Sequence, residues 1–161
     1  MKTATVKELK QELVGRNHSE LVNICLRLSK FKKENKELLT YLLYENSNER
    51  AYIEGVKREI KADYEQINTA SYFYIKKSVR KILRNTKKYI RYSDKKETEV
   101  ELLIYFCQEL KKVLPLSDKL LPLKKLYHRQ IEAIQKSILS LHEDLQYDYS
   151  VELDELFGTV K

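Results

Sequence analysis

Glycine and proline are scarce in this chain: three glycines and two prolines stand among 161 residues. Turn-rich β architectures need many Gly, Pro and Asn-Gly corners, and such corners are missing here. Leu, Lys, Glu, Ile and Arg dominate instead, as helix surfaces and apolar stripes require. The sequence therefore predicts an all-α fold, either an irregular helical bundle or a short right-handed α-superhelix of six to eight helices.

Length and composition bound the domain organisation. A chain of 161 residues has the size of one ordinary domain and can bury a real core. Its 42% hydrophobic and 34% charged residues exclude intrinsic disorder. No Pro/Gly/Ser-rich linker, low-complexity tract or internal repeat divides the sequence. We therefore predict a single helical domain over residues 1–161.

Capping signals mark the first two helices. The Thr5 hydroxyl can cap the first turn of a helix while Glu8 reaches back to the Thr5 backbone, which makes a capping box. Gly15 is placed to end this helix. Asn17 or Ser19 can cap the second helix.

Apolar spacing places the next helices. A short third helix carries the leucines of residues 38–43, and the polar residues 46–48 break the pattern. The break at residues 68–69 is weak, so the fourth and fifth helices are either separate or continuous. The apolar positions of the fourth helix recur at helical spacing: Ile53, Val56, Ile60, Tyr64 and Ile67.

The C-terminal third contains both prolines. Residues 94–97 resemble a second capping box and predict the start of a sixth helix, which Pro115 stops. Pro122 suits the first turn of a seventh helix, and Ser150 is placed to cap a short last helix over residues 151–157, with Gly158 as its stop. The seventh helix carries an alternating stripe: Tyr127, Ile131, Ile134, Ile138, Leu141 and Leu145.

This stripe covers close to three heptads and has two interpretations. In a bundle it is the buried face of the most central helix. In a dimer it is a short coiled-coil seam, because an exposed apolar stripe is an interface.

Residues 76–91 contain eight basic residues and no acidic one, more positive charge than the net +7 of the whole chain. At about 100° per residue these charges fall on the arc opposite the apolar positions Ile75, Val79 and Ile82. They form the candidate anion- or partner-binding face: Lys76, Lys77, Arg80, Lys81, Arg84, Lys87, Lys88 and Arg91.

Like charges at i,i+4 repel, so this face slightly lowers the stability of the helix unless opposite charges neutralise it. The leading hypothesis is a non-enzymatic module that binds an acidic protein, or itself, through the basic helix. Residues 143–155 hold six acidic residues and no basic one, and can supply the charge from the same chain or another copy. The alternatives are weak sequence-independent nucleic-acid binding, an anionic membrane surface and a merely solvated face. No aromatic residue lies within the basic arc, and Phe73 only borders it, which speaks against base stacking.

Two resemblances concern the N-terminal region. Residues 6–13 and 19–28 resemble the SAP motif, a small DNA-binding helix-loop-helix, but the connection at residues 14–18 is shorter than in that motif. Two short helices packing on the body are the alternative. The chain also resembles an uncharacterised family of small bacterial helical proteins, a domain of unknown function. The resemblance rests on residues 9–21, on residues 36–39 and on the acidic helical segment at 141–156. That resemblance implies a helical fold and a bacterial cytoplasm, and no activity.

Catalytic and metal signatures are weak. His128 and Glu132 stand at i,i+4, but no third metal ligand follows from the spacing. There is no Gly-rich phosphate loop and no nucleophile elbow. We therefore expect no enzyme, cofactor, metal site or catalytic residue. The competing idea is a small enzyme using His128 and a pocket of aromatic residues: Tyr72, Phe73, Tyr74, Tyr147 and Tyr149.

The remaining signals concern location. Cys25 and Cys107 each fall on an apolar helix face and are expected to be reduced core residues. No apolar run approaches the roughly 18 residues of a membrane span, and the N-terminus has no apolar signal region. We expect a cytoplasmic protein.

Overall fold

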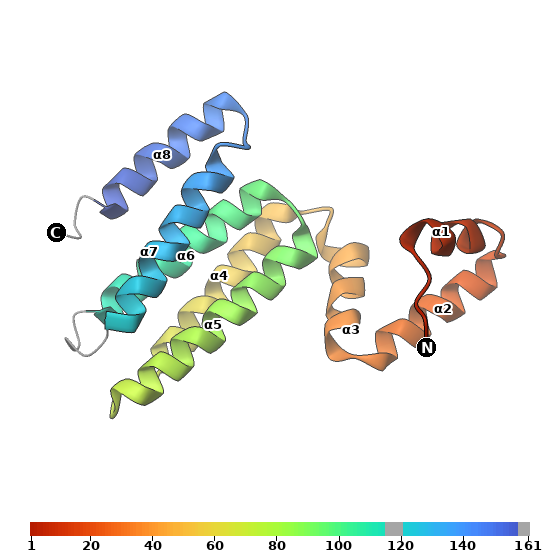
Figure 1. The fold of residues 1–161 in the computed structure, drawn as a ribbon, viewed down its shortest axis with the longest axis horizontal. Coiled ribbons are helices and arrows are strands. Elements are labelled where there is room, and N and C mark those ends of the chain that lie inside the picture. The colour runs from red at the N-terminus through yellow and green to blue at the C-terminus, as the bar shows by residue number, and fades with distance from the viewer. Residues whose placement is uncertain (115–120, 158–161) are drawn as a thin grey trace. The chain divides into compact units, whose positions relative to one another are not determined.

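The part of the chain that the structure describes folds into α-helices (Figure 1). The computed structural model describes residues 1–114 and 121–157. These residues form eight α-helices and one short π-helical segment, and none of them lies in a β-strand. The predicted all-α class is confirmed.

The chain divides into two compact units, Met1–Tyr44 and Glu45–Lys161. No linker composition marks residue 44, which is why the sequence alone indicates no boundary there. The organisation as one folding domain stays a prediction, and each unit is described by itself.

The smaller unit contains three helices: α1 (Val6–Val14), α2 (His18–Phe31) and α3 (Lys33–Thr40). The capping box of Thr5 and Glu8 is confirmed, and Gly15 is the C-cap of α1. Asn17, not Ser19, caps α2, with its Oδ1 2.9 Å from the Glu20 backbone nitrogen.

None of these three helices has a buried residue, so the prediction that Cys25 lies in a core is wrong. Three helices of this length enclose too little volume to remove their apolar stripes from water. A π-helical segment, Tyr41–Glu45, follows α3.

The larger unit contains α4 (Glu49–Glu65), α5 (Tyr72–Ser93), α6 (Lys96–Val113), α7 (Leu121–Ile138) and α8 (Glu143–Phe157). α6 is its central helix and contacts all four of the others. Its side chains are buried on most of its circumference, as expected of a helix with neighbours on several sides. Eight of its residues are no more than 2% exposed: Thr98, Val100, Leu102, Leu103, Ile104, Phe106, Cys107 and Leu110.

The fourth and fifth helices are separate, which answers the question that the sequence left open. Asn48 caps α4, and Ser71 caps α5. Ile67 lies in the connection and not in α4, contrary to the predicted stripe. Tyr52, one turn before Val56, instead extends the buried face of α4 at its N-terminal end.

The corner between α5 and α6 corrects a second prediction. Asp94 does not begin a capping box; it ends α5 in the left-handed conformation, with φ of 55°. The N-cap of α6 is Lys95, which makes no side-chain capping bond. Because Asp94 closes one helix, its side chain is not in position to cap the next.

The C-terminal helices also differ from the prediction. α7 ends at Ile138, and Leu145 belongs to α8, so no continuous heptad seam runs from Tyr127 to Leu145. α8 is longer than predicted and contains Ser150 in its interior. Pro122 lies in the first turn of α7 as predicted, whereas Pro115 and Gly158 fall outside the described residues.

Candidate binding face on α5

The two faces of α5 differ sharply in burial. Ile75, Val79 and Ile82 are 0 to 3% exposed and pack into the core of the larger unit. The Thr86 hydroxyl, also buried, donates to the Ile82 carbonyl oxygen at 2.9 Å, which satisfies it within the helix. The apolar spacing thus fixes the rotation of α5 and turns the opposite arc outward.

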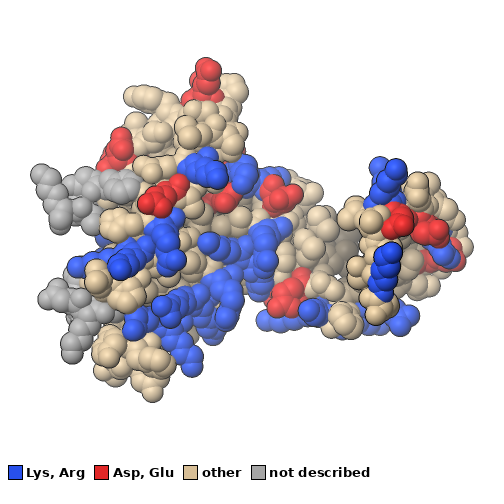
Figure 2. Space-filling view, in the orientation of Figure 1, with Lys and Arg blue, Asp and Glu red and all other residues tan. Residues whose placement is uncertain are grey.

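Six of the eight basic side chains are exposed: Lys77, Arg80, Lys81, Arg84, Lys87 and Arg91. Lys76 and Lys88 are half-buried at the edges of the face, with each Nζ below 5 Å from a tyrosine ring centroid: 4.9 Å for Lys76 over Tyr72 and 4.7 Å for Lys88 over Tyr89. Figure 2 shows lysine and arginine gathered over α5, below the rest of the larger unit.

The six exposed cations have no ion-pair partner among residues 1–114 and 121–157. The acidic helix α8 packs against α6 and α7. Figure 1 shows α8 and α5 on opposite sides of the larger unit, with α6 and α7 between them. Residues 143–155 therefore do not cover the basic face of their own unit.

A groove of about 570 Å³ runs along one side of this face. Its floor is apolar and comes from three helices, with Leu83 and Ile90 from α5, Leu103 from α6 and Ala133 from α7. Its cationic rim is Arg80, Arg84, Lys87 and Arg91, and Glu99 of α6 is the one carboxylate that lines it. We call this feature the α5 groove.

A second hollow, of about 410 Å³, lies nearer the start of α5. Phe73 lines it together with Lys76, Lys77, Arg80, Lys81 and Arg84. The Phe73 ring is 59% exposed, so an aromatic surface does adjoin the basic side chains. The sequence places Phe73 only at the border of the arc, since a helical projection does not show where long side chains converge.

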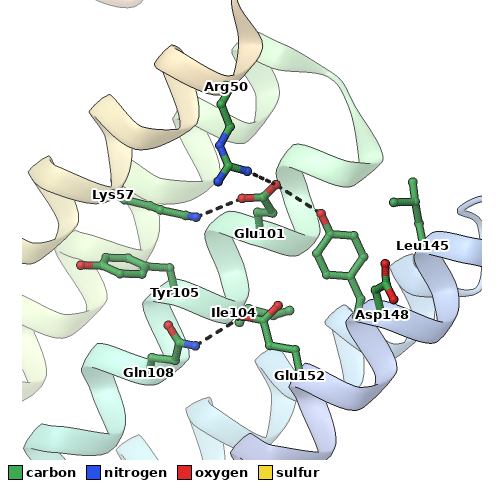
Figure 3. A pocket seen from close by; sticks show the side chains of 10 residues that line it. Arg50, Lys57, Glu101, Ile104, Tyr105, Gln108, Leu145, Asp148 and Glu152 are labelled. Atoms are coloured by element: carbon green, nitrogen blue, oxygen red, sulfur yellow. Dashed lines mark hydrogen bonds and ion pairs between the residues drawn. The ribbon is translucent and has the colours of Figure 1, made fainter.

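A polar pocket of about 350 Å³ lies elsewhere, among α4, α6 and α8 (Figure 3). Glu101 is at its centre, with Lys57 Nζ at 3.0 Å and Arg50 Nη1 at 3.7 Å from its carboxylate. The Tyr149 hydroxyl donates to the same carboxylate at 3.2 Å.

Both cations of this pocket are paired with Glu101. Burial lowers the pKa of Lys57, but hydrogen bonding and attraction to Glu101 outweigh it, so the pKa is raised. Burial raises the pKa of Glu152, whose carboxylate accepts from Gln108 at 3.5 Å. Because these contacts join side chains of three helices, we interpret the pocket as a tie between α4, α6 and α8.

The other predicted chemistry finds no assembled site. No group of three or more potential metal ligands occurs in the described part of the chain, and His128 and Glu132 are exposed on α7. The aromatic residues suggested as one pocket divide between α5 and α8, on opposite sides of the unit. Burial raises the pKa of the Cys107 thiol to about 12, so this cysteine is a poor nucleophile.

Comparison with known proteins does not assign the chain to a family. The chain matches no protein-family model, no curated protein and no solved structure. The resemblances to the SAP motif and to the uncharacterised bacterial family therefore stay predictions. Among its described residues, the chain has no helix of the length and apolar character needed to cross a bilayer.

Proposed function

We propose that this protein is a non-enzymatic interaction module that binds acidic protein segments through the α5 groove. The observation that carries the proposal is the pairing of an apolar floor with four cations that have no carboxylate partner among the described residues. A partner helix with acidic and apolar residues on one face can satisfy both parts at once. Complementary charge also raises the association rate and fixes the register.

The apolar floor favours a protein over a nucleic acid. Phosphate contacts use cationic side chains and leave the half-buried apolar surface of Leu83, Ile90 and Ala133 without a matching group. A peptide partner instead gains from burying the floor, at roughly 25 cal/mol per Å² of apolar surface.

Nucleic-acid binding remains the second candidate because of Phe73. Single-stranded nucleic acids bind where exposed aromatic rings adjoin a cationic groove, and stacking on such a ring is tolerant of sequence. The hollow lined by Phe73 and five basic side chains has that composition. The expected ligand is a single strand bound weakly and without sequence preference.

We further propose that the protein acts in a bacterial cytoplasm. The resemblance of its sequence to a bacterial helical family supports the source. The exposed free thiol of Cys25 supports a reducing compartment, in which such a thiol persists. Fractionation of producing cells should recover the protein with cytosolic markers, and recovery with membranes would contradict the proposal.

A titration against a labelled synthetic peptide tests the proposed function. The peptide is an acidic amphipathic helix with apolar residues at i, i+3 and i+7, and fluorescence anisotropy reports binding. We expect Arg84→Glu/Arg91→Glu to raise the Kd by about tenfold or more, because two attractive contacts become repulsive. The matched control Lys7→Glu/Lys10→Glu makes the same net-charge change on α1 and should leave the Kd unchanged.

The same titration with a labelled single strand separates the two candidates. Phosphate contacts by six side chains cost on the order of a thousandfold in affinity between about 50 and 200 mM salt. Strand binding with that slope, abolished by Phe73→Ala, would favour the nucleic-acid function. If the groove variant Arg84→Glu/Arg91→Glu and the α1 control Lys7→Glu/Lys10→Glu weaken peptide binding equally, the peptide does not bind specifically in the α5 groove.

A further inference from the structure

The outward face of α8 is itself amphipathic. Tyr147 and Val151 stand at i,i+4 and are 73% and 45% exposed. Acidic residues surround them on the same outward arc, at about 100° per residue. These are Glu143, Asp144, Asp148, Asp154 and Glu155. An acidic helix that turns two apolar side chains to solvent has the composition expected of a ligand for the α5 groove.

The α5 groove and the outward face of α8 are also similar in length, and in both of them apolar residues lie between charged ones. The groove cations run from Arg80 to Arg91, and the outward acidic residues of α8 run from Glu143 to Glu155. They span eleven and twelve residue steps, or roughly 16 and 18 Å at 1.5 Å rise per residue. Apolar residues are interleaved in both: Leu83 and Ile90 in the groove floor, Tyr147 and Val151 on α8.

We propose that α8 of one copy of this protein docks in the α5 groove of a second copy. This rests on the proposed function and names its partner. Because α8 and α5 lie on opposite sides of the larger unit, the contact within one copy is excluded by geometry (Figure 1). Each copy carries one donor helix and one acceptor groove, which makes the contact head-to-tail and generates open chains or closed rings.

Light scattering on the full chain measures the association. The weight-average mass should rise at least about twofold between about 10 µM and 1 mM protein, a range suited to weak contacts. The rise should disappear at about 1 M salt, where the Debye length is about 3 Å. A mass that stays monomeric throughout would overturn the proposal.

Charge-reversed pairs locate the contact. Arg80→Glu/Arg84→Glu/Arg91→Glu reverses the net charge of the groove lining, and Asp144→Lys/Asp154→Lys/Glu155→Lys reverses the net charge of the outward face of α8. Each variant alone should remain monomeric, since its groove and helix carry the same sign. A mixture of the two should associate again, because each groove then meets a helix of opposite charge. Failure of the mixture to associate, with both variants folded by circular dichroism, would overturn the assignment.

A variant without charge change keeps the test decisive. Tyr147→Ala/Val151→Ala should raise the concentration needed for association by about tenfold, because it removes the apolar contacts. An unchanged mass would show that another surface associates. If the protein stays monomeric yet the synthetic acidic peptide still binds the groove, self-docking fails and the proposed function stands. If neither binds, both fail.

Discussion

Glu49, in the first turn of α4, joins the corner between α5 and α6. Its Oε1 accepts from the Ser93 hydroxyl and from the Thr98 hydroxyl, the latter at 2.6 Å. Its Oε2 accepts from Lys95 Nζ at 2.7 Å. We expect Glu49→Ala to lower the free energy of unfolding by about 2 kcal/mol, because partly buried donors lose their acceptor. Urea titration followed by circular dichroism measures this loss.

Glu65→Ala, also in α4, is the matched control. The Glu65 carboxylate lies 4.0 Å from Lys61 Nζ, and both side chains are more than half exposed. Such a surface pair contributes less than about 1 kcal/mol, so this variant should unfold almost as the parent does. Equal losses in the two variants would mean that Glu49 does not hold the corner.

No sequence signal identifies Glu49 as an anchor. Its partners Ser93 and Thr98 lie 44 and 49 residues further along the chain. Local patterns such as capping boxes connect residues three or four apart, and so predict Thr5 with Glu8 correctly. A contact between distant residues depends on how the helices pack, which one sequence does not specify.

At the scale of the element, Asp94 ends α5 in the left-handed backbone conformation. It is the one non-glycine residue among them with positive φ, and its backbone N–H donates to the Ile90 carbonyl oxygen at 2.9 Å. Short polar side chains tolerate this left-handed region, and β-branched ones do not. We expect Asp94→Val to lower the free energy of unfolding by about 1–2 kcal/mol and Asp94→Asn to leave it unchanged.

Thermal and urea unfolding of the two variants check this expectation. Asn is the matched control because it tolerates the same conformation without the charge. An equal loss in both variants would mean that the carboxylate, and not the backbone conformation, is what α5 needs at its end.

We propose that the basic face of α5 serves binding rather than stability, and one substitution separates these roles. Arg84→Glu replaces repulsion with attraction toward Arg80 and Lys88, each four residues away. We expect the free energy of unfolding to stay level or rise by a few tenths of a kcal/mol, since such pairs contribute about that much. A loss of more than about 1 kcal/mol in the free energy of unfolding would mean that Arg84 does contribute to stability. Ile82→Ala, on the buried side, should cost about 3 kcal/mol.

The existence of a helix and the direction of its buried face can be predicted where apolar residues recur at helical spacing over a long, unbroken segment. α5 has 22 residues of consistent spacing, so its buried and charged faces follow from sequence. The end of α7 is not predictable in this way, because Leu141 and Leu145 continue the stripe across a real turn. There the Leu141 backbone N–H donates to the Ile138 carbonyl oxygen, closing the helix. Apolar spacing indicates which residues face the core, and partly buried residues such as Leu141 continue past the end of a helix.

At the scale of the molecule, the α5 groove arises only from packing. The sequence supplies its cations, but Leu103 and Ala133 reach it from α6 and α7. Which helices adjoin α5 depends on the whole arrangement of the larger unit. The charge pattern therefore predicts the candidate face, whereas the apolar floor that favours a protein partner becomes visible only in the fold.

The core of the larger unit is rich in groups that ionise in alkali. Burial raises the pKa of the Cys107 thiol from 9.0 to about 12, and it also raises the pKa values of Tyr64 and Tyr127. In the unfolded chain these groups lose their protons near pH 9 to 10. The folded state therefore binds more protons than the unfolded state above that pH, and stability falls as pH rises.

We expect full stability below about pH 8.5 and a loss above it that steepens as the tyrosines ionise in the unfolded chain. Each group that is neutral when folded and ionised when unfolded contributes about 1.4 kcal/mol per pH unit. Urea titrations from about pH 7 to 11 measure the slope. Cys107→Ala should unfold more easily at neutral pH, because a buried side chain is shortened, yet lose less stability per pH unit between about pH 9 and 10. A parent protein with flat stability to about pH 10.5, or a variant with the parent's slope, would mean that these groups are not buried in the core.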